Sequence, residues 1–318
     1  MGSITDVPGV EVGNASDKAG GTGCTVVLFR GGAVGGVDVR GGAPGTRETD
    51  LLRPENLAQT VHAFYLGGGS AYGLAGAEGV MQYLEEQKIG FDTGVGVVPI
   101  VPGAVLFDLP VGNPGARPDK KMGYKACMDA GPSNSEHGNA GAGTGASVGK
   151  LKGMQNAMKG GLGTASIAVG ELFVGAIVAV NCLGDVIERN GSILAGLLSD
   201  DKKTFASTAE SIKASYSLKK NLFSGNTTIG AIATNAKLDK AAANKVASMA
   251  HDGFARAINP IHTMFDGDTI FCGATGLITA DTTTVGSLAA EVMAEAIRDA
   301  VKSAEGAYGL PSYKDILL

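Results

Sequence analysis

Glycine makes up 50 of the 318 residues, about twice the usual share, and this excess restricts what the chain can fold into. The glycines form clusters with no fixed period, which excludes collagen-like repeats and predicts many tight turns and close backbone approaches. Because valine and isoleucine are also abundant, we expect sheets with crowded edges.

Short apolar runs typical of strands alternate with helical patterns in the first half. Residues 24–29 and 33–40 predict two strands joined by a hairpin at Arg30. Residues 60–66 predict a strand that leads through three glycines into a helix over residues 71–86. The order of strand, glycine and helix indicates that helices pack on a sheet.

The second half has the clearest periodicity, above all in residues 285–301, where apolar residues recur at helical spacing over four turns. Strands and helices in both halves, with no linker between them, predict one α/β (α+β) domain in which helices cover two sheets, although a doubly wound sheet fits the same pattern. The other elements expected here are two strands within 166–187 that turn at Gly170, a helix at 201–218, a loop at 219–226, a strand at 227–234, a helix at 238–258 and a short strand at 270–272.

The charge balance is mildly acidic, with 26 Lys and Arg against 31 Asp and Glu, and does not favour nucleic acid as a partner. The most apolar run, residues 165–180, is too short to span a bilayer and contains Glu171. Residues 1–10 do not have the pattern of a secretion signal. We therefore expect a cytoplasmic protein with no membrane partner.

The four cysteines are scattered along the chain and form no C-x-x-C pair. This spacing predicts reduced, mostly buried thiols and favours neither a zinc site nor a disulfide framework. The four are Cys24, Cys127, Cys182 and Cys272.

Thr227 lies where a polar loop meets an apolar strand, a position that suits a reactive terminus. A threonine hydroxyl is a weak nucleophile, and four histidines offer few conventional bases. Cleavage of the bond between Asn226 and Thr227 would create a free α-amine, with a pKa near 7.7 to 8, as an internal base. The alternative is that Thr227 and Thr228 are simply the β-branched start of a strand.

Downstream of this threonine, Asp266 and Asp268 flank a glycine in a predicted turn that follows His262. Two carboxylates at this spacing can orient an ammonium group and hold a hydroxyl. Binding of a divalent cation and capping of the turn are alternatives that the spacing leaves open. A lone histidine such as His262 is more often a packed or surface residue.

The glycine-rich stretch 143–150 superficially resembles a phosphate-binding loop and ends in Lys150. It departs from that pattern, because Thr144 stands where a glycine is needed and Leu151 where Ser or Thr is needed. A turn that brings Lys150 towards a developing oxyanion is another use of the same residues. Asn181, at the close of an apolar strand, suits a turn or an amide donor in a cleft.

Taken in order along the chain, several short motifs resemble the DOM-fold peptidase family, which includes β-peptidyl aminopeptidases, D-aminopeptidases and nylon-oligomer hydrolases. Those around Thr227 and Asp266 look most similar to the nylon-oligomer hydrolase branch, whose self-cleavage also falls between Asn and Thr. The motifs are residues 4–13, 68–74, 138–145, 159–166, 226–229 and 266–271.

The resemblance implies an αββα sandwich of the N-terminal-nucleophile hydrolase type, self-cleavage into residues 1–226 and 227–318, and a homotetramer. It implies that Asp266 and Asp268 are an acidic pair beside the nucleophile Thr227. Asn181 matches an oxyanion-hole amide, and Lys150 matches a lysine of the nylonase branch, whereas the aminopeptidase lysine aligns better with Lys159. The nylonase branch has an active-site tyrosine where this chain has Phe107, which bears on the choice of substrate.

The function expected from these features is hydrolysis of small peptides or amides through an acyl-enzyme on Thr227, with no cofactor. Exo and endo cleavage, and α-, β- and ω-amino-acid substrates, are all compatible with the residues. The alternatives are an acyltransferase resembling the self-cleaved ornithine acetyltransferases, a non-catalytic binding protein, and a metal enzyme built on Asp266 and Asp268.

Overall fold

A computed structural model describes residues 2–215 and 225–316. Its main feature is a nine-stranded mixed sheet, with β1 (Glu11–Asp17) paired to the first half of β2. The other strands, in spatial order, are β10 (Gly161–Val169), β11 (Leu172–Asn181), β14 (Thr227–Ala236), β16 (Thr269–Ile278), β2 (Thr22–Val39), β4 (Thr60–Gly67), β7 (Gly103–Val105) and β3 (Thr46–Arg47).

The sheet bends at β2, so that it forms two layers and β2 belongs to both. Its first half pairs with β1 and β4, and residues 34–39 pair with β16. The two layers face each other across a buried core in which Phe64 of β4 stacks on Phe271 of β16, with ring centroids 5.0 Å apart. This stacked pair is part of the packing between the layers.

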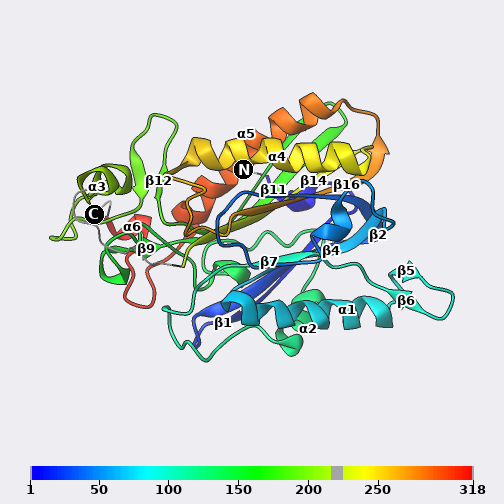
Figure 1. Ribbon diagram of the computed structural model, residues 1–318, viewed down its shortest axis with the longest axis horizontal. Coiled ribbons are helices and arrows are strands. Elements are labelled where there is room, and N and C mark those ends of the chain that lie inside the picture. The colour runs from blue at the N-terminus through cyan, green and yellow to red at the C-terminus, as the bar shows by residue number, and fades with distance from the viewer. Residues whose placement is uncertain (1, 216–224, 317–318) are drawn as a thin grey trace.

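Helices cover both outer faces, so the molecule has four layers, as Figure 1 shows. A second core packs α4 (Lys240–Ala257) and α5 (Thr282–Ser303) on the β10, β11, β14 and β16 side. A third packs α1 (Gly76–Glu86) and α2 (Lys120–Met128) on β1, β2 and β4. The expected αββα arrangement is confirmed.

Smaller elements complete the chain around these layers. Three short strands form a separate sheet, and two more pairs form two-stranded ribbons. They are β12 (Asp185–Ile187), β13 (Ile193–Ala195) and β15 (Ile258–Asn259), the pair β5 (Phe91–Asp92) and β6 (Val97–Val98), the pair β8 (Ser147–Val148) and β9 (Met158–Lys159), and the helices α3 (Thr208–Ser215) and α6 (Tyr313–Ile316).

Side-chain caps explain where the two long helices begin. Asp239 precedes α4 and accepts a hydrogen bond from the backbone N–H of Ala242, and Asp281 precedes α5 and accepts one from Thr284. Such caps satisfy backbone donors that have no partner within the helix. The apolar face of α5 packs on β10 and β11, as its periodicity predicts.

The hairpin expected at Arg30 is wrong. Residues 22–39 form one strand whose pairing with β4 shifts between Leu28 and Ala33, and Gly32 adopts a φ of +77° at this irregularity. Extra residues in one strand bend it without reversing the chain. The bend allows β2 to pair in both layers.

Other sequence predictions need smaller corrections. The doubly wound alternative is wrong, because among the pairs of the large sheet only β14 with β16 and β4 with β7 run parallel. The helix expected over 71–86 begins as a 3-10 helix, Ser70–Ala75. Of the helix expected over 201–218, residues 208–215 form α3, residues 201–207 are not helical, and residues 216–218 lie outside the described part of the chain. Residues 219–224 of the expected loop lie outside the described part of the chain.

Two further predictions concern membrane spans and the cysteines. Within residues 2–215 and 225–316, no helix combines the length and the apolar character needed to cross a bilayer. All four cysteines are buried and free, as their spacing predicts.

Candidate active site

Thr227 begins the central strand β14 and lies between two neighbours. It is opposite Asn181, the last residue of β11, and β16 begins on the other side, with Ile229 opposite Thr269. Because side chains alternate along a strand, Thr227 faces the same way as Ile229 and Ala231, into the space between the sheets. Thr227 is only 4% exposed.

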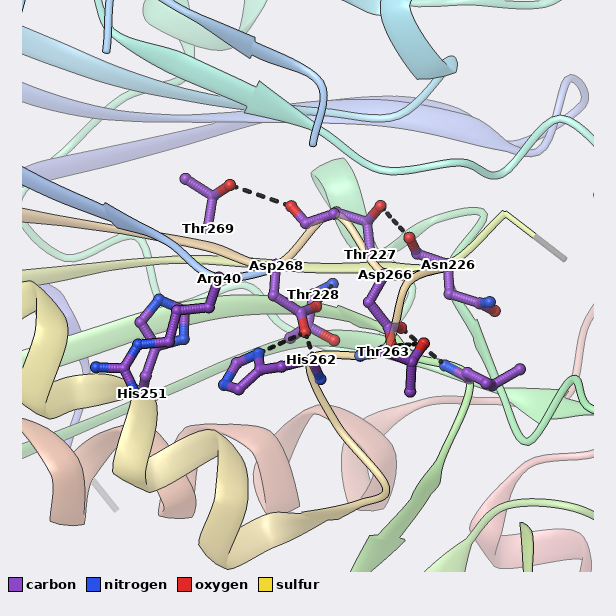
Figure 2. Close-up of polar contacts among 12 residues, drawn as sticks. Arg40, Asn226, Thr227, Thr228, His251, His262, Thr263, Asp266, Asp268 and Thr269 are labelled. Carbon is purple, nitrogen blue, oxygen red and sulfur yellow. Dashed lines mark hydrogen bonds and ion pairs between the residues drawn. The ribbon is translucent and has the colours of Figure 1, made fainter. Parts of the chain in front are cut away.

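The peptide before Thr227 is held along the turn that leads into β16. The N–H of Asn226 donates to the carbonyl of Phe265 at 3.2 Å, and the N–H of Gly267 donates to the carbonyl of Asn226 at 3.1 Å. The hydroxyl of Thr227 also donates to that carbonyl, as Figure 2 shows. The nucleophile predicted from the sequence therefore touches the bond that it is expected to cut.

Asp268 is fully buried and binds the backbone next to this bond. Its Oδ1 accepts from the N–H of Thr228 at 2.8 Å. Its Oδ2 accepts from the N–H of His262 at 3.2 Å and lies 2.8 Å from Nδ1 of the same residue (Figure 2). The carboxylate therefore fixes the start of β14 through Thr228.

Asp266 is the second buried carboxylate, on the other side of Gly267. Its Oδ2 accepts from the N–H of Thr263 at 2.9 Å and from the hydroxyl of Thr263 at 2.5 Å. Burial raises the pKa of the Asp266 carboxyl above its usual value, and the negative charge of Asp268 raises it further.

Asn181 connects Thr227 to Lys150. The Lys150 ammonium donates to the side-chain oxygen of Asn181 at 2.8 Å and to its carbonyl at 3.0 Å, and the N–H of Ser147 binds the same side-chain oxygen. The amide nitrogen of Asn181 donates to the carbonyl of Phe107 at 3.0 Å. Burial lowers the pKa of Lys150 to about 8, so a substantial fraction of the amine is neutral near that pH.

Lys159 lies apart from this group. Its ammonium donates to the carbonyls of Gly143, Ala146 and Gly160 at 2.8 to 3.0 Å, and burial lowers its pKa to about 7. These bonds hold the glycine-rich turn that carries Ser147. Of the two lysines considered from the sequence, Lys150 is the one that contacts Asn181 directly.

A cavity of about 260 Å³ opens next to Gly225, the residue that precedes Asn226. Phe107, Pro110 and Met154 give it an apolar wall, and Lys150 and Ser147 lie at its polar end. Gly225 also lines it and packs against the Phe107 ring, where a Cβ would come within 2.4 Å. The cavity therefore adjoins the acyl side of the bond between Asn226 and Thr227.

Several residues of this site were not identified from the sequence. Gly267, Ser147 and Thr263 act through backbone groups or a single hydroxyl, and sequence patterns give no sign of such roles. The sequence alone favours a packed or surface position for His262. The structure joins its ring to Asp268. The Asp-Gly-Asp spacing was the one signal that pointed to this turn.

Comparison with known proteins gives consistent matches. The chain matches the model of peptidase family S58 over residues 2–313. An uncharacterized aminopeptidase of Mycobacterium leprae is 46% identical, covering 98% of this chain and 93% of that protein. A 6-aminohexanoate-oligomer endohydrolase of Kocuria sp. is 33% identical, covering 93% of this chain and 85% of that protein.

Among solved structures, the L-aminopeptidase D-Ala-esterase/amidase of Ochrobactrum anthropi is similar, with a TM-score of 0.71 at 17% identity. The match covers 97% of this chain and 88% of that one, whose structure is described as a variant of the Ntn hydrolase fold. The likeness extends over the whole αββα arrangement, and the family match extends over nearly the whole sequence. The chain belongs to peptidase family S58, and it is a hydrolase of peptide or amide bonds.

Proposed function

We propose that the protein is a self-processing amidohydrolase that cuts itself between Asn226 and Thr227 and then uses Thr227 as its N-terminal nucleophile. The observation that carries the proposal is the contact of the Thr227 hydroxyl with the Asn226 carbonyl inside a buried polar site. A reacting group held in place against its target gains a large effective concentration. Self-cleavage would give chains of residues 1–226 and 227–318.

Before cleavage Thr227 has no free amine, so neighbouring groups must take the proton of its hydroxyl. Lys150 and the Asp266/Asp268 pair are the candidates. Lys150 is supported by its pKa of about 8 and by its hydrogen bond to Asn181, which lies opposite Thr227. Attack on the Asn226 carbonyl gives an ester, which water then hydrolyses.

In the mature enzyme the α-amine of Thr227 takes the proton from its own hydroxyl, because an α-amine titrates near neutral pH. The hydroxyl attacks a substrate amide, and water hydrolyses the acyl-enzyme. Asp268 supports the liberated terminus through the neighbouring N–H of Thr228. Asn181, held by Lys150 and Ser147, is the proposed side-chain donor to the oxyanion.

The substrate we propose is a small peptide or an amino-acid oligomer. The largely apolar cavity beside Phe107 and Met154 supports an acyl group with an uncharged, apolar part. Names among the relatives include both aminopeptidases and an endohydrolase of 6-aminohexanoate oligomers, so both modes of cleavage belong in the first substrate panel. A cytoplasmic location and a homotetramer remain predictions.

Substitution of the nucleophile tests the proposal. Thr227→Ala should migrate as one uncut band on denaturing electrophoresis and show no amidase activity, because it lacks the attacking oxygen. Thr227→Ser should keep part of both properties. Mass spectrometry of the wild type should find a fragment that begins Thr-Thr-Ile-Gly. A fully processed Thr227→Ala chain would refute the scheme.

An acyltransferase is the second candidate, because an acyl-enzyme can react with an amine as well as with water. The two activities are separated by adding an amine acceptor and measuring how the acyl group divides between hydrolysis and transfer. Dominant transfer at low acceptor concentration would favour the acyltransferase.

A further inference from the structure

The scissile carbonyl of Asn226 already has a backbone donor. The N–H of Gly267 points at this oxygen from 3.1 Å, within the range of a good hydrogen bond. The oxygen is the atom that becomes negatively charged when the Thr227 hydroxyl attacks. A donor in this place stabilises the transition state of cleavage more than the starting peptide.

We propose that Gly267 is a catalytic residue of the self-cleavage and that its backbone N–H is the oxyanion donor. This inference rests on the proposed function, and it assigns to the turn between Asp266 and Asp268 a chemical task of its own. The side-chain amide of Asn181, by comparison, donates to the carbonyl of Phe107 before cleavage. The backbone donor is already on the reacting carbonyl.

The proposed self-cleavage needs no group other than the residues of the site and water. The Thr227 oxygen bonds to the Asn226 carbonyl carbon as its proton passes to a neighbouring base, and the carbonyl oxygen becomes an oxyanion on the Gly267 N–H. The bond from that carbon to the Thr227 nitrogen then breaks as the nitrogen takes up a proton. Water hydrolyses the resulting ester, which restores the hydroxyl and releases the Asn226 carboxylate.

Rigid neighbours hold this donor in place. On one side Asp266 accepts two hydrogen bonds from Thr263, and on the other Asp268 accepts hydrogen bonds from Thr228 and His262. The peptide between the two carboxylates has little freedom to turn away. Donors that are fixed before the reaction need no reorganisation when charge develops, which makes them effective.

The absence of a side chain at residue 267 leaves room for the nucleophile beside this donor. A Cβ there would lie 2.8 Å from the Thr227 hydroxyl oxygen and 2.6 Å from the Ala43 carbonyl oxygen. Both distances are shorter than ordinary contacts, so a larger residue would displace the nucleophile or the neighbouring loop. Glycine alone places a backbone donor this close to the reacting hydroxyl.

Replacing the Gly267 N–H by an ester oxygen tests the donor without adding an atom. Glycolic acid is introduced at position 267 during cell-free translation, and appearance of the Thr227 fragment is followed by mass spectrometry. Self-cleavage should slow about 10²- to 10³-fold, the usual effect of losing one oxyanion donor. Glycolic acid at Gly131, whose N–H binds the Val12 carbonyl at 3.1 Å away from the site, is the control and should cleave at the wild-type rate.

A recombinant pair gives a second test. Gly267→Ala should fold but cleave slowly, whereas Gly131→Ala, where a Cβ meets nothing within 4 Å, should cleave normally. If the ester at 267 cleaves as fast as the ester at 131, the inference is wrong while the proposed function stands. If the wild-type chain never cleaves, the proposed function is wrong, and the inference that rests on it is wrong as well. Thermal unfolding of each variant confirms that it is folded.

Discussion

Lys150 should make the stability of the uncleaved chain depend on pH in a direction opposite to that of a buried carboxylate. Lys150 is 4% exposed, its amine binds Asn181 through two hydrogen bonds, and its surroundings disfavour the charged form. Burial lowers the pKa of Lys150 from 10.5 to about 8. The proposed perturbation is Lys150→Met, which keeps a chain of similar length and removes the titrating group.

The expected size follows from that shift. Each pKa unit is worth about 1.4 kcal/mol, so keeping Lys150 charged in the folded chain costs about 3 kcal/mol at pH 7. Between pH 8 and pH 10.5 the unfolded chain binds more protons than the folded chain, so the free energy of unfolding rises with pH. The penalty is fully present below about pH 8 and fades towards pH 10.5.

The assay is denaturant unfolding at pH 7 and pH 10, with Thr227→Ala in every chain so that none is cut. The chain with Lys150 should gain about 2 to 3 kcal/mol over Lys150→Met between these pH values. Lys152→Met, which alters an exposed lysine two residues away, is the matched control and should show no such change. If the stability difference between the chain that keeps Lys150 and the Lys150→Met chain stays constant with pH, the reasoning is refuted.

Two further substitutions test the rest of the site. His262→Gly removes the side-chain contact with Asp268 at a position whose left-handed backbone glycine tolerates. Because one hydrogen bond contributes about 0.5 to 1.5 kcal/mol, self-cleavage should slow about 2- to 10-fold. An unchanged time course on denaturing gels would contradict this role. Phe107→Tyr adds a hydroxyl to the apolar wall of the cavity. Relative to a substrate with an alkyl acyl group, kcat/KM for a substrate whose acyl group can form a hydrogen bond should rise about 10-fold. If this ratio is the same in the variant and the wild type, the acyl group does not bind in this cavity.

Local sequence patterns predicted the parts of the fold in which burial follows a simple period. The helix expected over 285–301 is the core of α5, and the strand expected at 227–234 is most of β14. Both elements bury one face along their length, so their periodicity is visible in the sequence. The pairing of β2 with both layers depends on partners far along the chain, so the local pattern at Arg30 predicts a hairpin instead of one bent strand.

The residues of the candidate site also differ in how far the sequence predicts them. Residue types and spacing indicate Thr227, Asp266 and Asp268. They leave several uses open for Lys150 and Asn181, and the family resemblance selects one use for each. Their convergence depends on the register of β11 against β14, which places Asn181 opposite Thr227 and which no local pattern determines. The contribution of Gly267 is a backbone group, so its residue type carries no chemical signal beyond the preference of glycine for turns.

Strand register also explains why we propose Thr227, and not the adjacent Thr228, as the nucleophile. Thr227 and Thr228 have the same hydroxyl, but successive side chains of a strand point to opposite faces. Thr227 shares its face with Ile229, between the sheets and against the Asn226 carbonyl, whereas Thr228 shares its face with Ile232, beneath the helices. Within the described residues the Thr228 hydroxyl has no hydrogen-bond partner. Thr228 therefore cannot replace a missing Thr227 hydroxyl unless β14 shifts by one residue, and that shift would exchange the side chains that fill the two cores on either side of the strand.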